Sequence, residues 1–259
     1  SAIVPSWHDR HIFDVTSVAV FLPRIHPAAV DMRRKRIMHA QRNVFGSAPL
    51  PPIEGETQPA GFDPIIITGG MDDTLHLWSY SSGKVIESLH DADSHITSLT
   101  CIQLDQSANS KFSGPVVIAG DGNGTIWVWA LRAPFELICT LKGHTDEVRS
   151  VYVYDAEGIP PVLVSGSLDC TVKVWNLEPM KLHKTMAGPT SDVTVVRVFN
   201  LGGSDLALVS ASSDTTARIV FDFMEAAPQL DVVMQLFHFD VNGTNIHVTA
   251  DSTSNFPRI

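Results

Sequence analysis

A short pattern recurs four times along this chain and constrains its fold more than any other feature. The four copies read IIITGGMDDTLHLW over residues 65–78, VVIAGDGNGTIWVW over 116–129, VLVSGSLDCTVKVW over 162–175 and LALVSASSDTTARIV over 206–220. Each copy is an apolar strand, a polar turn and a second strand whose side chains alternate between two faces. One such unit cannot bury both of its faces, so the copies are expected to stack on one another.

The spacing of the copies indicates how large each unit is. The acidic or amide turn residue recurs at separations of 51, 46 and 45 residues, at Asp72, Asn123, Asp169 and Asp214. The second strand closes on an aromatic residue in three copies and on valine in the fourth, at Trp78, Trp129, Trp175 and Val220. This period is close to the ~40–45 residues of a four-stranded propeller blade, and radial stacking of such blades buries both faces.

The third copy carries the most detailed motif. Gly143-His144 precedes the unit, Ser165-Gly166-Ser167 ends one strand, Asp169 lies in the turn, and the next strand ends at Trp175-Asn176. These residues resemble the WD-repeat (WD40) family, with Trp-Asn in place of the usual Trp-Asp. The resemblance extends over roughly residues 12–237 apart from one insertion. It implies an all-β fold, a β-propeller of four-stranded antiparallel blades.

The repeat also divides the chain into blades. We expect one propeller region over residues 1–259, with blade units at about 12–89, 94–141, 146–186 and 192–237 and a candidate start of a fifth at 241–259. WD-repeat propellers usually have seven blades, so the ring is expected to be incomplete. The missing blades would come from unobserved sequence, a partner chain or a dimer mate. A basic and Pro-rich insertion at 23–63 interrupts the first unit, with a short helix expected over 28–44.

The family resemblance assigns a structural role to four residues of the third unit. It implies a buried hydrogen-bond chain through His144, Ser165, Asp169 and Trp175. A serine, a histidine and an aspartate also suggest a hydrolase triad, but a nucleophile needs an oxyanion site and an open cleft, and no G-x-S-x-G motif is present. The other units lack parts of this set; in the second, Ala92 stands at the histidine position.

Metal, nucleotide and nucleic-acid functions are weakly supported. His8 and His11 have no further ligands at metal spacing, and residues 120–124 align with a strand-to-strand turn, not a phosphate loop. None of the three cysteines forms a Cys-x-x-Cys pair. The net charge of −10 disfavours binding to a nucleic-acid backbone. We therefore expect no metal, no cofactor and no nucleic-acid partner.

The expected function is a non-catalytic protein-protein interaction scaffold. In WD-repeat proteins the partner-facing rim uses the residues around the first apolar position of each first strand and the residue before the turn aspartate. The resemblance carries these positions over to Asp14, Thr16, Met71, His95, Thr97, Gly122, Glu147, Arg149, Leu168, Asp192, Thr194 and Ser213. The set holds three carboxylates and one arginine, so a partner with basic character is favoured. The alternative is a targeting or substrate-recruiting module of a larger enzyme or trafficking protein whose catalytic part lies outside this chain.

Location is expected to be cytoplasmic. No apolar run approaches the ~20 residues that span a bilayer, and no signal peptide is visible. The basic run Arg33–Arg36 is either a solvated face of the insertion or a nuclear-import signal. Ala48–Pro52 is either a linker or a polyproline ligand for another domain.

Overall fold

The computed structural model describes residues 14–22, 63–104, 113–156, 159–202, 205–221, 223–224, 236–239 and 246–248. All regular elements within these residues are β-strands. The predicted helix over 28–44 and most of the insertion lie outside the described residues.

The strands form four antiparallel sheets, which we number as blades one to four. Blade one comprises β1 (Val15–Phe21), β2 (Ile65–Gly70), β3 (Leu75–Ser79) and β4 (Val85–Leu89). Blade two comprises β5 (Ile96–Leu104), β6 (Gly114–Asp121), β7 (Thr125–Ala130) and β8 (Leu137–Lys142). Blade three comprises β9 (Val148–Ala156), β10 (Ile159–Ser167), β11 (Thr171–Asn176) and β12 (Lys181–Ala187).

Blade four has one strand more than the others. It comprises β13 (Val193–Gly202), β14 (Asp205–Ser212), β15 (Ala217–Phe221), β16 (Leu236–Phe239) and β17 (Ile246–Val248), paired in that order. The candidate start of a fifth blade at 241–259 therefore contributes β17 to the edge of the fourth sheet, so no fifth sheet begins within the described residues.

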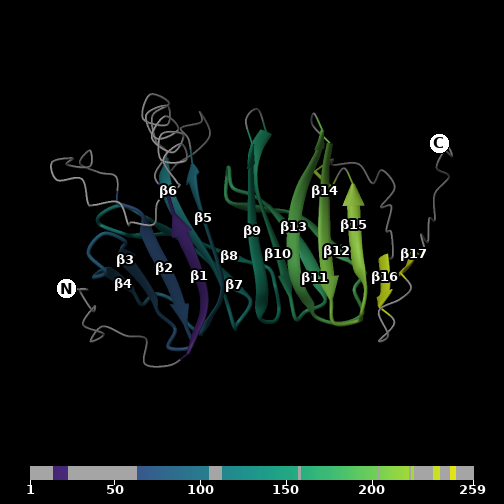
Figure 1. Cartoon of the computed structure of the whole chain (residues 1–259), viewed down its shortest axis with the longest axis horizontal. Coiled ribbons are helices and arrows are strands. Elements are labelled where there is room, and N and C mark those ends of the chain that lie inside the picture. Colours follow the sequence, from purple (N-terminus) through teal and green to yellow (C-terminus); the bar gives the residue numbers. More distant parts are fainter. Residues whose placement is uncertain are drawn as a thin grey trace, which may run out of the picture.

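The blades stack face to face in sequence order. The first strands of successive blades contact one another, β1 with β5, β5 with β9 and β9 with β13, which places them on the inner side of the stack (Figure 1). Three apolar clusters fill the spaces between blades one and two, two and three, and three and four. Each interior face is thus buried by a neighbouring blade.

The four blades form an open arc and not a closed ring. Within the described strands, no contact between first strands joins blade four to blade one (Figure 1). The prediction of a WD40-type β-propeller made of four-stranded blades is confirmed for this part of the chain, and the ring is incomplete within it.

A repeated glycine contact sets how closely the blades approach. The first residue of each first strand, which we term the opening residue, lies directly over a glycine in the second strand of the preceding blade. A Cβ at Gly69 would overlap the side chain of Ile96, one at Gly120 would lie 2.6 Å from Cγ1 of Val148, and one at Gly166 would lie 2.5 Å from Cγ1 of Val193. These distances are far below van der Waals contact, so a side chain at these positions would force the blades apart.

Candidate functional site

The four residues expected to form a hydrogen-bond chain meet in blade three. The indole Nε1 of Trp175 donates to Ser165 Oγ over 2.8 Å, and Ser165 Oγ lies 2.8 Å from Nε2 of His144. The other ring nitrogen of His144, Nδ1, lies 2.8 Å from Oδ2 of Asp169. The chain therefore joins β11 to β10, then to the segment before β9, and finally to the turn between β10 and β11.

Burial decides the protonation of this chain. It lowers the pKa of His144 below the ordinary value of 6.5, and the opposing hydrogen bond from Asp169 does not compensate. Burial acts to raise the pKa of Asp169, but hydrogen bonds from Thr171 and His144 outweigh it and hold that pKa below its ordinary value. The ring is therefore neutral near pH 7: Nδ1–H donates to the carboxylate, and the Ser165 hydroxyl donates to Nε2.

This geometry excludes Ser165 as an accessible nucleophile. The side chain is fully buried and also accepts the Trp175 indole N–H, so a substrate has no route to the hydroxyl. A triad needs a nucleophile at an open cleft beside an oxyanion site. The same residue types therefore act here as a buried polar network that fixes the turn and the strand leading into the blade.

Blade two builds a different network that the alignment of Asn123 with Asp169 missed. The buried carboxylate of Asp121 accepts the Trp127 indole N–H over 2.7 Å and the backbone N–H groups of Asn123 and Thr125 over 2.9 and 2.8 Å. The turn acid thus lies two residues earlier, inside the Gly-Asp-Gly-Asn-Gly run. The second tryptophan, Trp129, donates instead to Asp91 over 2.8 Å.

Blades one and four keep only parts of the chain. In blade one, Trp78 Nε1 donates to Thr68 Oγ1 over 2.9 Å. In blade four, Asp214 accepts the backbone N–H of Thr190 over 2.8 Å, and Arg218 lies 3.7 Å away. Burial acts to raise the pKa of Asp214, but hydrogen bonds, first that from the Thr216 hydroxyl, hold it far below its ordinary value.

The residues carried over as a partner-facing rim lie together at one edge of the arc. In every blade the residue before the turn donates its backbone N–H to the residue that precedes or opens the first strand. The four pairs are Met71 with Asp14, Gly122 with His95, Leu168 with Glu147, and Ser213 with Asp192. This edge, which we term the turn rim, is the lower one in Figure 1.

The charged side chains of the turn rim form a chain across blades two to four. Arg149 Nε lies 3.3 Å from one carboxylate oxygen of Glu147, and His95 Nε2 lies 4.0 Å from the other. Hydrogen bonds from Ser191 and Ser213 lower the pKa of Asp192, and the nearby Arg149 adds to this effect. Arg149 is about half exposed, with 48% of its side chain accessible, whereas Glu147 is only 17% accessible.

Arg149 occupies a position that the other blades use for structure. The residue after the opening residue is threonine in blades one, two and four. The hydroxyls of Thr16 and Thr97 donate to the glycine carbonyl of their own blade and to the opening residue's carbonyl in the next blade, Ile96 and Val148 respectively. Thr194 donates to Ala211 over 3.2 Å. Arginine cannot repeat this bond, so blade three gives up a structural contact to present a cation on the rim.

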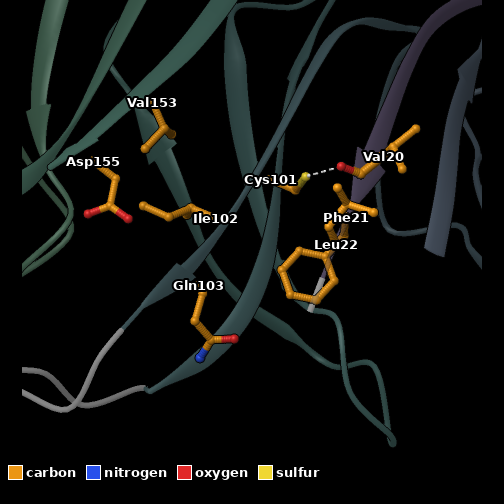
Figure 2. Close-up of a pocket in the computed structure, with 8 residues that line it drawn as sticks. All are labelled: Val20, Phe21, Leu22, Cys101, Ile102, Gln103, Val153 and Asp155. Atoms are coloured by element: carbon orange, nitrogen blue, oxygen red, sulfur yellow. Dashed lines mark hydrogen bonds between the residues drawn. The ribbon is translucent and has the colours of Figure 1, made fainter. Parts of the chain in front are cut away.

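The opposite edge of the arc carries a small pocket. The ends of β1, β5 and β9 enclose about 240 Å³, lined by Val20, Phe21, Leu22, Cys101, Ile102, Gln103, Val153 and Asp155 (Figure 2). The thiol of Cys101 donates to the Val20 carbonyl over 3.5 Å, and burial raises its pKa to about 11. This thiol is protonated at neutral pH and is not an activated nucleophile.

Metal binding finds no support among the residues described above. No three side chains of histidine, cysteine, aspartate or glutamate gather at ligand distances there. His8, His11 and Arg33–Arg36 lie outside the described residues. No described helix is long and apolar enough to span a bilayer.

Comparison with known proteins agrees with this architecture. The profile of the family described as "WD domain, G-beta repeat" matches residues 135–176. The chain is 30% identical to Protein ROOT INITIATION DEFECTIVE 3 of Arabidopsis thaliana over 131 residues, 46% of this chain and 27% of that protein. It is 30% identical to Autophagy-related protein 16 of Arabidopsis thaliana over 112 residues, 43% of this chain and 20% of that protein. It is 27% identical to WD repeat-containing protein pop2 of Schizosaccharomyces pombe over 140 residues, 43% of this chain and 19% of that protein. The chain thus spans about a quarter or less of the length of these relatives.

The first prediction compares the turn acids of blades two and three. Replacing Asp169 or Asp121 with alanine leaves buried donors without an acceptor and should lower the free energy of unfolding by roughly 1–3 kcal/mol. Asn123→Ala should cost less, because the only side-chain hydrogen bond of Asn123 among the described contacts is a long one, 3.4 Å to the Asp93 carbonyl. Urea denaturation of the three variants and the parent measures the difference. Equal midpoints for all four proteins would contradict the assignment.

The second prediction concerns pH. Because burial lowers the pKa of His144, the unfolded chain takes up a proton before the folded one as the pH falls. The stabilisation is present above about pH 6.5, the ordinary histidine pKa, and is lost progressively below it. The free energy of unfolding should therefore fall more steeply between pH 7.5 and 5 in the parent than in His144→Gln. Parallel pH profiles would show that His144 is not held neutral.

Proposed function

Because the chain is a WD40-repeat protein, we propose that it is a non-catalytic scaffold that binds a partner protein on the turn rim, with Glu147 and Arg149 near the centre of the contact. A rigid stack of sheets presents turns at a fixed geometry, and binding residues commonly lie on such turns. The pocket at the opposite edge offers no activated nucleophile or metal-ligand cluster within the described residues.

The observation that carries the proposal is the exchange of threonine for arginine at position 149. Selection for stability alone favours the hydroxyl that bridges blades one and two and blades two and three. Arginine is enriched at the energetic centres of interfaces, where it makes several directed hydrogen bonds. The neighbouring Glu147 holds the guanidinium in place, which lowers the entropy lost when a partner binds.

The charge of the rim favours a partner segment with basic residues. The carboxylates of Asp14, Glu147 and Asp192 lie on the same edge as the single cation Arg149. A basic segment would meet the unpaired carboxylates, while a carbonyl or carboxylate of the partner would meet Arg149. Complementary charge of this kind mainly raises the association rate and fixes the register.

A second candidate keeps the same binding surface but gives it a different purpose. The relatives that match this chain are several times longer than the matched region. The arc would then recruit a substrate or a location for catalytic or trafficking parts elsewhere in a larger protein. Both candidates need an intact turn rim. They differ in whether the polypeptide containing this arc also carries a catalytic domain.

The third prediction tests the rim directly. The double variant Glu147→Ala with Arg149→Ala should fold like the parent, because both side chains are outside the apolar clusters, and should lose the main co-purifying protein. The matched control is Lys84→Ala with Glu87→Ala, an exposed charged pair in and beside β4. Quantitative mass spectrometry of proteins bound to the intact protein gives the readout.

Loss of the partner from the rim variant but not from the control supports the proposal. Equal recovery on both variants would place the binding surface elsewhere, with the opposite edge of the arc the next surface to test. Weaker recovery at higher salt is expected if the partner segment is basic, since screening reduces attraction between exposed charges.

A further inference from the structure

The face of blade four that points away from blade three is apolar and uncovered. On β13, Val195, Phe199 and Leu201 are 43%, 52% and 59% exposed. The matching positions of β15, Ala217 and Ile219, are partly exposed, whereas their counterparts in blade one, Leu75 and Leu77, are fully buried under blade two. A contiguous apolar face of this kind marks an interaction surface.

The one charged residue in this row is held away from the face. Arg197 alternates with Val195 and Phe199, but its guanidinium carbon lies 5.1 Å from the ring centre of Tyr152 in blade three. Its NH1 group also donates to the Val196 carbonyl over 2.7 Å. The face therefore remains apolar between its two ends.

Blade four lacks the glycine that receives a neighbouring blade. In the strand pairing, Gly166 lies opposite Val172 and Ala211 lies opposite Ala217, so Ala211 occupies the glycine position. The β-branched opening residues Ile96, Val148 and Val193 fit only over glycine. A blade that packs on blade four in the same way must open with a smaller residue. This excludes blade one of a second copy, because its opening residue is Val15.

The spacing of the chain identifies the opening residue that would come next. In each blade one residue of the fourth strand pairs opposite the start of the third strand, and the next opening residue follows it by seven. The pairs are Leu89 and Ile96, Leu141 and Val148, and Met186 and Val193. In blade four the corresponding residue is Leu236, which pairs with Ala217. Seven residues later the chain has Gly243.

The residues after Gly243 repeat the rest of the first-strand pattern. Thr244 follows it, as Thr16, Thr97 and Thr194 follow their opening residues. Ile246 and Val248 then stand at the spacing of Val196 and Val198, the buried residues of β13. The exchange is reciprocal: where the second strand gains a methyl group at Ala211, the opening residue loses its side chain.

We propose that residues 243–248 are the first strand of a fifth blade and pack on the outer face of blade four, with Gly243 against Ala211. Val195 and Phe199 lose their exposure in this arrangement. The hydroxyl of Thr194, which now donates to the Ala211 carbonyl, gains the Gly243 carbonyl as a second acceptor. Thr16 and Thr97 make the equivalent pair of bonds at the first two blade contacts.

This placement competes with the edge pairing seen for β17. Ile246–Val248 pairs with β16 at the outer edge of the fourth sheet, which leaves the apolar face of blade four open. The two placements exclude each other. At the edge, the size of residue 243 has no bearing on Ala211, so coupling between the two positions separates the alternatives.

The fourth prediction is a double-mutant cycle in the intact protein. Gly243→Val should raise the equilibrium constant of unfolding about tenfold, because a β-branched side chain does not fit over Ala211. Adding Ala211→Gly should restore most of this loss by recreating the contact of the internal blades. The matched control is Asn242→Val, which places the same side chain one residue earlier. Additive effects of the two substitutions, or a Gly243→Val variant as stable as the control, would overturn the proposal.

Thiol labelling gives a second, independent readout. A cysteine at Val195 should react at least about tenfold more slowly than one at Val18, which is 64% exposed on the open face of blade one. Gly243→Val should remove this protection and the added Ala211→Gly should restore it. Peptide-resolved mass spectrometry separates the new thiols from Cys101, Cys139 and Cys170. Equal labelling rates at the two positions in the parent would show that residues 243–248 do not cover blade four.

Discussion

The arc depends on one contact that is made three times, between a glycine in the second strand of a blade and the opening residue of the next blade. Gly69, Gly120 and Gly166 leave no space for a Cβ atom beside Ile96, Val148 and Val193. The close approach brings the two apolar faces together, so the three clusters between the blades can exclude water. A blade that lost this contact would expose the interior of its neighbour.

The hydrogen-bond networks act within the blades and vary more than the glycine contact does. Blade three uses the full chain from Trp175 to Asp169, while blade two ties the same turn with Asp121. Different residues can satisfy the same buried backbone groups, because each donor needs only some acceptor. The close approach of two backbones has no such substitute. This difference explains why the glycine persists in blade two, where the histidine and serine of the network are absent.

Much of the fold was accessible from the sequence, since the repeat fixes the strand pattern and the stacking. The network of blade three was accessible for the same reason, because its motif is complete. Asp121 was missed because alignment of turn residues selected Asn123, although the acid lies two positions away. The structural role of Thr16 and Thr97 was also missed, because their second acceptors belong to the next blade and only the stacked structure brings them together. The significance of Arg149 follows from that comparison and was not visible from its charge alone.

The most direct test of this account is the stability of Gly120→Ala measured against Gly143→Ala. At Gly120 the new methyl group would lie 2.8 Å from Cβ of Val148 and 3.1 Å from its carbonyl oxygen, while at Gly143 it meets Trp175 at 3.0 Å and otherwise only the Lys173 side chain beyond 3.5 Å. Gly120→Ala should therefore lower the free energy of unfolding by roughly 1–3 kcal/mol, and Gly143→Ala by clearly less. Equal stability of the two variants would contradict the claim that the glycine contact holds the blades together.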